Sequence, residues 1–171
     1  MERENCMAIV VYRVGDDIST DVIYPGRYMA TVLPTETPQF AFADDAVFNG
    51  KLKAKQIPAG SVIVGGQNFG CGSSREQAVS CLKGHEVIIV ARSFARIFLQ
   101  NCINLGLRVV PCPTIEASDG DELEITAAEV INKNCSRHFP VLALPKSRQA
   151  IIDTGGLIGY TRSKLIKIAV G

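Results

Sequence analysis

The middle of the sequence alternates short apolar runs with segments of helical spacing. The runs occupy residues 61–65, 86–91 and 107–111. Their length and β-branched content predict buried strands. Between them, apolar residues recur at helical intervals over 73–83 and 94–105, and each segment is followed by a glycine, Gly84 or Gly106, which is typical of a helix end. The predicted core face of the second helix comprises Phe94, Ile97, Phe98, Cys102 and Leu105. This alternation favours a parallel sheet with right-handed crossovers.

The two ends of the sequence follow other patterns. Residues 7–14 are typical of a strand, whereas 15–45 contain several prolines and no regular period, which predicts short helices within long loops. Beyond Pro113, alternating apolar and polar residues predict antiparallel strands, and residues 146–153 predict a last helix. We therefore expect an α/β fold in one domain spanning 1–171, with parallel strands flanked by helices and an added antiparallel section.

Charge and hydropathy exclude several classes of protein. The 171 residues include 18 Lys or Arg and 17 Asp or Glu, a net charge of +1, so no charge excess favours nucleic acid or a membrane surface as a partner. No apolar run reaches the roughly 18 residues that a membrane span needs. Residues 1–5 are largely charged and the apolar run at 6–12 is short, so we expect no signal peptide and a cytoplasmic protein.

The cysteines and histidines form no pattern typical of a metal site. The cysteines are Cys6, Cys71, Cys81, Cys102, Cys112 and Cys135. None belongs to a C-x-x-C pair and no histidine lies at zinc-finger spacing, so we expect this chain to bind no metal itself. Most cysteines should pack as small apolar residues. We expect His85 and His138 to be surface or capping residues.

The glycine-rich loop at 70–76, Gly-Cys-Gly-Ser-Ser-Arg-Glu, is the segment that most suggests chemistry. Glycines permit positive φ angles and close approach of the backbone. The loop lies between a predicted strand end and a predicted helix start, where free amides and the positive end of the helix dipole face outward. Ser73, Ser74 and Arg75 add two hydroxyls and a guanidinium at the same point, which favours a site for a carboxylate or phosphate.

Helix capping is an alternative interpretation of the same residues. In a capping box, a serine at 73 or 74 would cap the helix, and the side chain of Glu76 or Gln77 would reach back to it. A Walker loop and a dinucleotide fingerprint are both excluded, because their glycine and lysine spacings are absent. Cys71 has no neighbouring base in the sequence, so we expect it to be structural rather than nucleophilic. From the residues alone, anion binding and capping both stay open.

The loop and its surroundings resemble a known family. Residues 68–78, Asn-Phe-Gly-Cys-Gly-Ser-Ser-Arg-Glu-Gln-Ala, are similar to the signature of the swivel domain of the aconitase family, and in particular of its separate small subunits of the isopropylmalate dehydratase type. Further similar segments follow in the family's order at 17–25, 93–106 and 155–158. Gln77 stands where the family commonly has histidine. The resemblance implies a swivelling β/β/α domain.

The resemblance also implies an activity and roles for the loop residues. The family dehydrates and rehydrates hydroxy di- or tricarboxylic acids, with a 4Fe–4S cluster on a partner chain as the Lewis acid. Ser73 would be the base that takes the carbon-bound proton, and Ser74 and Arg75 would hold a substrate carboxylate. A serine is a poor base in water, and a helix N-terminus with an adjacent arginine favours its alkoxide. We therefore expect a hydro-lyase subunit that is inactive alone and pairs with a large iron–sulfur subunit as a heterodimer or heterotetramer.

The loop that the resemblance links to substrate choice comprises Tyr28, Met29, Ala30, Thr31 and Val32. Related enzymes often carry an arginine in this loop, where this chain has Ala30. Arg27 is then either a second carboxylate contact or a solvated surface residue. The apolar members of the loop suit an alkyl group better than a third carboxylate, because an unpaired carboxylate is costly to desolvate. Isopropylmalate, 2,3-dimethylmalate and related hydroxy acids stay open as substrates, and a non-catalytic anion-binding module is the alternative from a different class.

Overall fold

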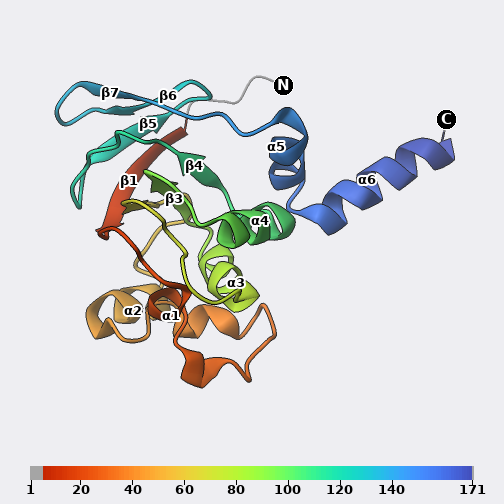
Figure 1. Ribbon diagram of the computed structural model, residues 1–171, viewed down its shortest axis with the longest axis horizontal. Helices are drawn as coiled ribbons and strands as arrows, with labels where there is room; N and C mark the ends of the chain where they lie inside the picture. The colour runs from red at the N-terminus through yellow and green to blue at the C-terminus, as the bar shows by residue number, and fades with distance from the viewer. Residues whose placement is uncertain (1–5, 171) are drawn as a thin grey trace.

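The computed structural model describes residues 6–170 and is built on one mixed sheet (Figure 1). Within these residues the sheet has seven strands in the order β4-β3-β2-β1-β5-β6-β7. The strands are β1 (Cys6–Arg13), β2 (Val62–Gly65), β3 (Ile88–Ala91), β4 (Val109–Pro111), β5 (Glu122–Ile125), β6 (Glu129–Asn132) and β7 (Arg137–Pro140). β1 comes first in the chain but lies at the centre of the sheet. No helix of this part of the chain is long and apolar enough to cross a membrane.

Strands β1 to β4 form the predicted parallel half of the sheet. β2 pairs with β1 and β3, and β3 pairs with β4, all in parallel. Alternate side chains point to opposite faces: Ile63 and Ile89 lie in the cluster under the helices, whereas Val62 and Ile88 lie in the cluster on the other face. Burial on both faces explains why these runs are continuously apolar.

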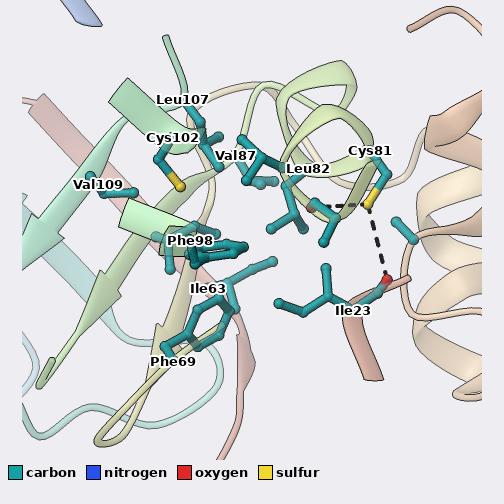
Figure 2. Packing of buried hydrophobic residues seen from close by; sticks show 14 of the residues in the cluster. Ile23, Ile63, Phe69, Cys81, Leu82, Val87, Phe98, Cys102, Leu107 and Val109 are labelled. Carbon is teal, nitrogen blue, oxygen red and sulfur yellow. Dashed lines mark hydrogen bonds between the residues drawn. The ribbon is translucent and has the colours of Figure 1, made fainter. Parts of the chain in front are cut away.

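Helices cover one face of the parallel half. The described helices are α1 (Thr20–Ile23), α2 (Ala46–Lys53), α3 (Glu76–Gly84), α4 (Arg96–Leu105), α5 (Lys146–Asp153) and α6 (Leu157–Val170), with 3-10 turns η1 (Gly26–Tyr28) and η2 (Thr37–Phe40). The crossover helices α3 and α4 contact each other. Figure 2 shows Leu82 of α3 and Phe98 of α4 in one cluster with Ile63 of the sheet. The short helices α1, η1 and η2 confirm the expectation for residues 15–45, whereas α2, which begins just after that region, was not predicted.

Two cysteines lie inside the same cluster. Cys81 and Cys102 are fully buried (Figure 2), and Cys81 donates a weak hydrogen bond to the carbonyl of Ala78 at 3.3 Å. Burial raises the pKa of both thiols above the ordinary range, because a thiolate would lose its hydration there. Cys112 is buried on the other face of the sheet. These three cysteines confirm the predicted packing role, whereas Cys6 and Cys71 are half-buried and Cys135 is exposed, so packing holds for half of the six and not for most.

The predicted antiparallel section continues the sheet beyond β1 and packs against the face of the parallel half that lies opposite the helices. β5 pairs with β1, β6 with β5, and β7 with β6, all antiparallel. Leu123, Val130 and Phe139 from these strands are buried in one cluster with Val62 and Val90 of the parallel half. The parallel half of the sheet therefore has a hydrophobic core on each face. One core lies between the parallel strands and the helices, and the other lies between the parallel and the antiparallel strands.

Two expectations about helices are wrong. Ile97 does not lie on the core face of α4, since 49% of its surface is exposed. The chain also does not stop being helical after α5: Gly155 and Gly156 have φ angles of 81° and 113°, and α6 follows them. Figure 1 shows α6 extending away from the sheet, where its apolar side chains are exposed, so no buried period marks it in the sequence.

Candidate functional site

The glycine-rich loop lies at the carboxyl end of β2, beside the segment that follows β1. The amide of Thr20 donates a hydrogen bond to the carbonyl of Cys71 at 2.8 Å. The hydroxyl of Thr20 donates to the carbonyl of Ser73, also at 2.8 Å. These bonds bring together two of the segments on which the family resemblance depends, 17–25 and 68–78.

The path of the loop requires glycine at two positions. Gly70 and Gly72 have φ angles of 81° and 88°, in the left-handed region that residues with a Cβ rarely adopt. A Cβ atom on Gly70 would also lie 2.1 Å from the ring of Phe98. The glycines therefore let the loop turn sharply against α4 and direct the residues after Gly72 outward.

Helix α3 begins later than the capping interpretation requires. Its N-cap is Arg75, and no side chain caps the free amides there. The predicted capping box is therefore wrong, because Ser73 and Ser74 both lie before the cap position. Both serines are exposed, and neither hydroxyl makes a hydrogen bond within the described residues. Gln77 does not reach back to them, and its side-chain amide donates to the carbonyl of Met29 at 3.5 Å.

A pocket of about 240 Å³ lies between this loop and the start of α4. It is lined by Thr20, Gly70, Gly72, Ser73, Ser74, Arg75, Ala95, Arg96, Ile97, Phe98 and Asn101. The structure thus places the predicted site residues Ser73, Ser74 and Arg75 around one cavity. The opposite wall comes from α4, to which sequence analysis assigned no role in the site. The only indication in the sequence that α4 belongs to the site was the family resemblance of residues 93–106.

The segment after β1 holds the guanidinium of Arg75 in place. The guanidinium forms an ion pair with Asp21 and donates to the carbonyl of Tyr24 at 3.2 Å. Only 15% of the Arg75 side chain is exposed, against 55% for Asp21. A guanidinium that is already oriented loses little side-chain entropy when a carboxylate binds. The guanidinium of Arg75 is therefore oriented in advance at the pocket, and Asp21 offsets part of its charge.

Arg27 does not line this pocket. Its guanidinium forms an ion pair with Asp44 at 2.5 Å and lies 4.7 Å from the centre of the Tyr28 ring. The hydrogen bond between the two charged groups lowers the pKa of the Asp44 carboxyl and raises the pKa of Arg27. Arg27 would have to leave Asp44 to hold a substrate carboxylate.

The predicted specificity loop lies beside α3, and none of its residues lines the 240 Å³ pocket. Its first residue, Tyr28, stacks on Phe40 with ring centroids 4.1 Å apart, which anchors the loop to η2. Met29, Ala30 and Val32 are exposed. The loop therefore presents mainly apolar side chains to its surroundings, as expected from its composition.

The donor groups of the pocket suit an anion rather than a metal cluster. The pocket is lined by hydroxyl, guanidinium and amide groups and by no thiol. Within residues 6–170, no group of three or more His, Cys, Asp or Glu side chains is placed to hold a metal ion. Cys71 is half-buried and its thiol donates to the carbonyl of Asp17 at 3.3 Å. His85 and His138 each bond to a neighbouring oxygen, at 2.9 and 3.1 Å.

A larger groove of about 750 Å³ lies at the carboxyl ends of β1 and β2, against the antiparallel section. It contains none of the three predicted loop residues. Two of its carboxylates already have partners, because Glu116 pairs with Arg137, and Asp121 accepts from Asn132 at 2.7 Å. The smaller pocket is therefore the candidate site, since it holds the exposed hydroxyls and the oriented guanidinium.

Comparison with known proteins identifies the family of the chain. Residues 17–113 match the family described as the aconitase C-terminal domain. The 3-isopropylmalate dehydratase small subunit of Methanosarcina mazei is 41% identical over 157 residues, which cover 88% of this chain and 93% of that protein. The 2,3-dimethylmalate dehydratase small subunit of Eubacterium barkeri is 40% identical over 156 residues, with coverage of 88% and 93%. The crystal structure of a 3-isopropylmalate dehydratase from Methanocaldococcus jannaschii matches with a TM-score of 0.86 and 37% identity, over 98% of this chain and 100% of that chain.

Proposed function

Because the chain belongs to the aconitase C-terminal domain family, as a small subunit of the dehydratase type, we propose that it completes the active site of an isopropylmalate-type hydro-lyase on a large partner subunit. One observation carries the proposal: two exposed, unbonded hydroxyls and one oriented guanidinium meet at a single pocket. Helix capping does not account for these serines, because the N-cap of α3 is Arg75 and no side chain caps the helix.

Ser73 is the base in this proposal. In dehydration its side-chain oxygen takes the proton from the substrate carbon, and in rehydration it returns that proton. The alkoxide form of serine is strongly disfavoured in water. The neighbouring Arg75 guanidinium and the uncapped amides at the start of α3 favour it in the closed site, where water no longer screens their charge.

Ser74 and Arg75 hold one substrate carboxylate. The guanidinium offers paired N–H donors, and the adjacent hydroxyl offers a further donor from the same wall of the pocket. A carboxylate held at this point fixes the distance between the substrate carbon and Ser73. Fixed orientation of this kind raises the reaction rate strongly, because the translational and rotational entropy of the reacting groups is lost on binding and not in the chemical step.

The partner subunit supplies what this chain lacks. The pocket has no thiol, so its residues do not fit a 4Fe–4S cluster, and we place the cluster on the large subunit. When bound there, the cluster supplies a Lewis acid for the leaving hydroxyl. The exposed serines lie where a partner would have to close over the site. The assembly is a heterodimer or heterotetramer in the cytoplasm, and the small chain alone is inactive.

Isopropylmalate is the first candidate substrate, and 2,3-dimethylmalate is the second. Both are hydroxy dicarboxylic acids with apolar substituents, which suits the exposed Met29 and Val32 of the specificity loop. Ala30 offers no cation for a third carboxylate, and leaving one unpaired in a closed site is costly. The dehydratase small subunit of Eubacterium barkeri, named for 2,3-dimethylmalate, is nearly as similar to this chain as the isopropylmalate relatives are, which keeps the second candidate open.

The test is the variant Ser73→Ala, assayed after anaerobic mixing with the iron–sulfur subunit and followed by the ultraviolet absorbance of the alkene product. Loss of the base should lower kcat by about 10²- to 10⁴-fold, the usual contribution of a general base. Ser147→Ala is the matched control, since Ser147 is exposed on α5 and does not line the pocket. Isopropylmalate, dimethylmalate and citrate should be compared in the same assay.

Near wild-type turnover by Ser73→Ala would exclude this serine as the base. No activity of the wild-type pair on any hydroxy acid, with the subunits shown to associate, would favour the non-catalytic anion-binding module.

A further inference from the structure

The pocket has a second wall that the proposed roles of the loop do not use. Arg96, Ile97 and Asn101 line it from the first six residues of α4. Ile97 and Asn101 are four residues apart, so they lie on the same face of the helix. This wall therefore combines a cation, an amide and an exposed apolar side chain.

Arg96 differs from the two arginines already described. Arg75 forms an ion pair with Asp21, and Arg27 forms an ion pair with Asp44. Arg96 is exposed at the pocket and forms no ion pair or side-chain hydrogen bond within residues 6–170. Its positive charge is thus available to an anion that enters the pocket.

Ile97 is apolar but is not part of the core. Helical spacing assigns it to the buried face, yet 49% of its surface is exposed and it lines the pocket. The side-chain amide of Asn101 is likewise unbonded within the described residues. Within the described residues, Ile97 belongs to neither hydrophobic core, and no hydrogen bond accounts for the position of the Asn101 amide.

We propose that Arg96 binds the second carboxylate of the substrate and that Ile97 contacts its alkyl group. This inference rests on the proposed function and narrows the substrate to a hydroxy dicarboxylate with a branched apolar substituent. One carboxylate lies on Ser74 and Arg75, and the other lies across the pocket on Arg96. Asn101 donates its amide to the same carboxylate as Arg96.

The charge balance of the closed site supports two separate cations. Each carboxylate that leaves water needs an opposite charge and hydrogen-bond donors, or the cost of desolvation opposes binding. Arg75 cannot neutralise both carboxylates, because Asp21 already offsets part of its charge. Of the two arginines that line the pocket, Arg96 is the one that can offset a second carboxylate without sharing its charge with an ion-pair partner in the described residues.

The test uses Arg96→Gln in the complex with the iron–sulfur subunit, with that subunit in saturating excess. KM should rise about 10- to 100-fold, the effect of losing a charged hydrogen bond to a carboxylate, while kcat changes far less. Arg148→Gln on α5 is the control, because Arg148 is exposed and lies outside the pocket. Affinity between the subunits is measured in parallel by sedimentation velocity.

Substrate analogues identify which carboxylate is involved. In two analogues, one or the other carboxylate is replaced by a neutral amide. The wild-type enzyme should show a higher KM for both analogues than for the dicarboxylate substrate. Arg96→Gln should lose its discrimination against one of them only, because the charge that recognised that carboxylate is gone. Ile97→Ala should raise KM several-fold for the branched substrate and leave KM for unbranched malate unchanged.

Unchanged KM in Arg96→Gln would overturn the inference. Weaker subunit association with unchanged KM would also overturn it, because Arg96 would then bind the partner protein instead of the substrate. Both of these results leave the role of Ser73 intact, since that role is judged by kcat in Ser73→Ala.

Discussion

Gly70 has a backbone conformation and a neighbour that both exclude a side chain. Its φ angle is 81°, and a Cβ atom there would lie 2.1 Å from Phe98, which is buried in the core under the helices. The site loop and the core therefore meet at this residue. A change at Gly70 should affect stability and the position of Ser73 together.

Gly70→Ala should lower the free energy of unfolding by about 3 kcal/mol, the sum of a left-handed Cβ penalty and an overpacked contact. Gly120→Ala is the matched control, because Gly120 has a φ angle of 88° and no atom lies within 4 Å of the position that its Cβ would occupy. Gly120→Ala should lower the free energy of unfolding only by the penalty for a Cβ atom in the left-handed region, about 1–2 kcal/mol. Urea unfolding followed by circular dichroism gives both values. If both variants lost the same free energy of unfolding, the contact between a Cβ atom at Gly70 and Phe98 would contribute nothing to the destabilisation.

At the scale of elements, α2 depends on one carboxylate at its start. Asp45 is the N-cap of α2, where its side chain accepts from the amide of Phe48 at 2.9 Å and from the hydroxyl of Tyr12 at 2.7 Å. These two hydrogen bonds hold the pKa of Asp45 below its ordinary value of 3.8. Through Tyr12, the cap also ties α2 to the central strand β1.

Asp45→Ala should lower the free energy of unfolding at pH 7 by about 2 kcal/mol, through loss of the cap and of the bond to Tyr12. Because folding lowers this pKa, the charge-dependent part is present above about pH 4 and is lost as pH falls through the folded pKa. The deficit relative to wild type should therefore shrink between about pH 5 and pH 2 in urea titrations. Asp44→Ala, which breaks an exposed ion pair, should cost less. A deficit that is independent of pH would mean that the charge of Asp45 contributes nothing.

Local patterns predict the elements well where burial has a period. The runs that form β2, β3 and β4 and the helices α3 to α5 all follow from apolar spacing and glycine stops. The same reasoning fails for α6, whose apolar residues are exposed, and for Ile97, whose spacing fits the core while its side chain lines the pocket. The loop Ser73–Arg75 was predictable because its residue types are unusual together. The position of Arg96 at the same pocket could not be predicted, because a single arginine at a helix start has no distinctive pattern.

At the scale of the whole molecule, no local sequence pattern predicts that β1 lies at the centre of the sheet. β1 pairs in parallel with β2 on one side and antiparallel with β5 on the other. Both partners are distant in the sequence, so no local spacing encodes the pairing. The same central strand ends at the segment that holds Thr20 and Asp21, which position the site loop. Sheet order and site geometry are therefore determined together, by contacts between distant segments.

Hydrogen exchange should reveal this arrangement. Amides of β2 and β3 should exchange slowest in the free chain, because both strands are paired on two sides and buried on both faces. Amides of Ser73 and Ser74 should exchange fast in the free chain and slow down on binding of the proposed large subunit. Mass spectrometry of peptic peptides measures both. Fast exchange at these serines in the assembled complex would contradict the proposed closure.

The central position of β1 has a consequence for how the chain is made. Ribosomes synthesise this strand before any of its neighbours, and its second partner, β5, ends only at Ile125. A nascent or prematurely terminated chain therefore carries an unpaired strand edge, which other chains can extend. Truncated products that end before Ile125 should aggregate, and chaperones that act during translation should favour the yield of intact protein.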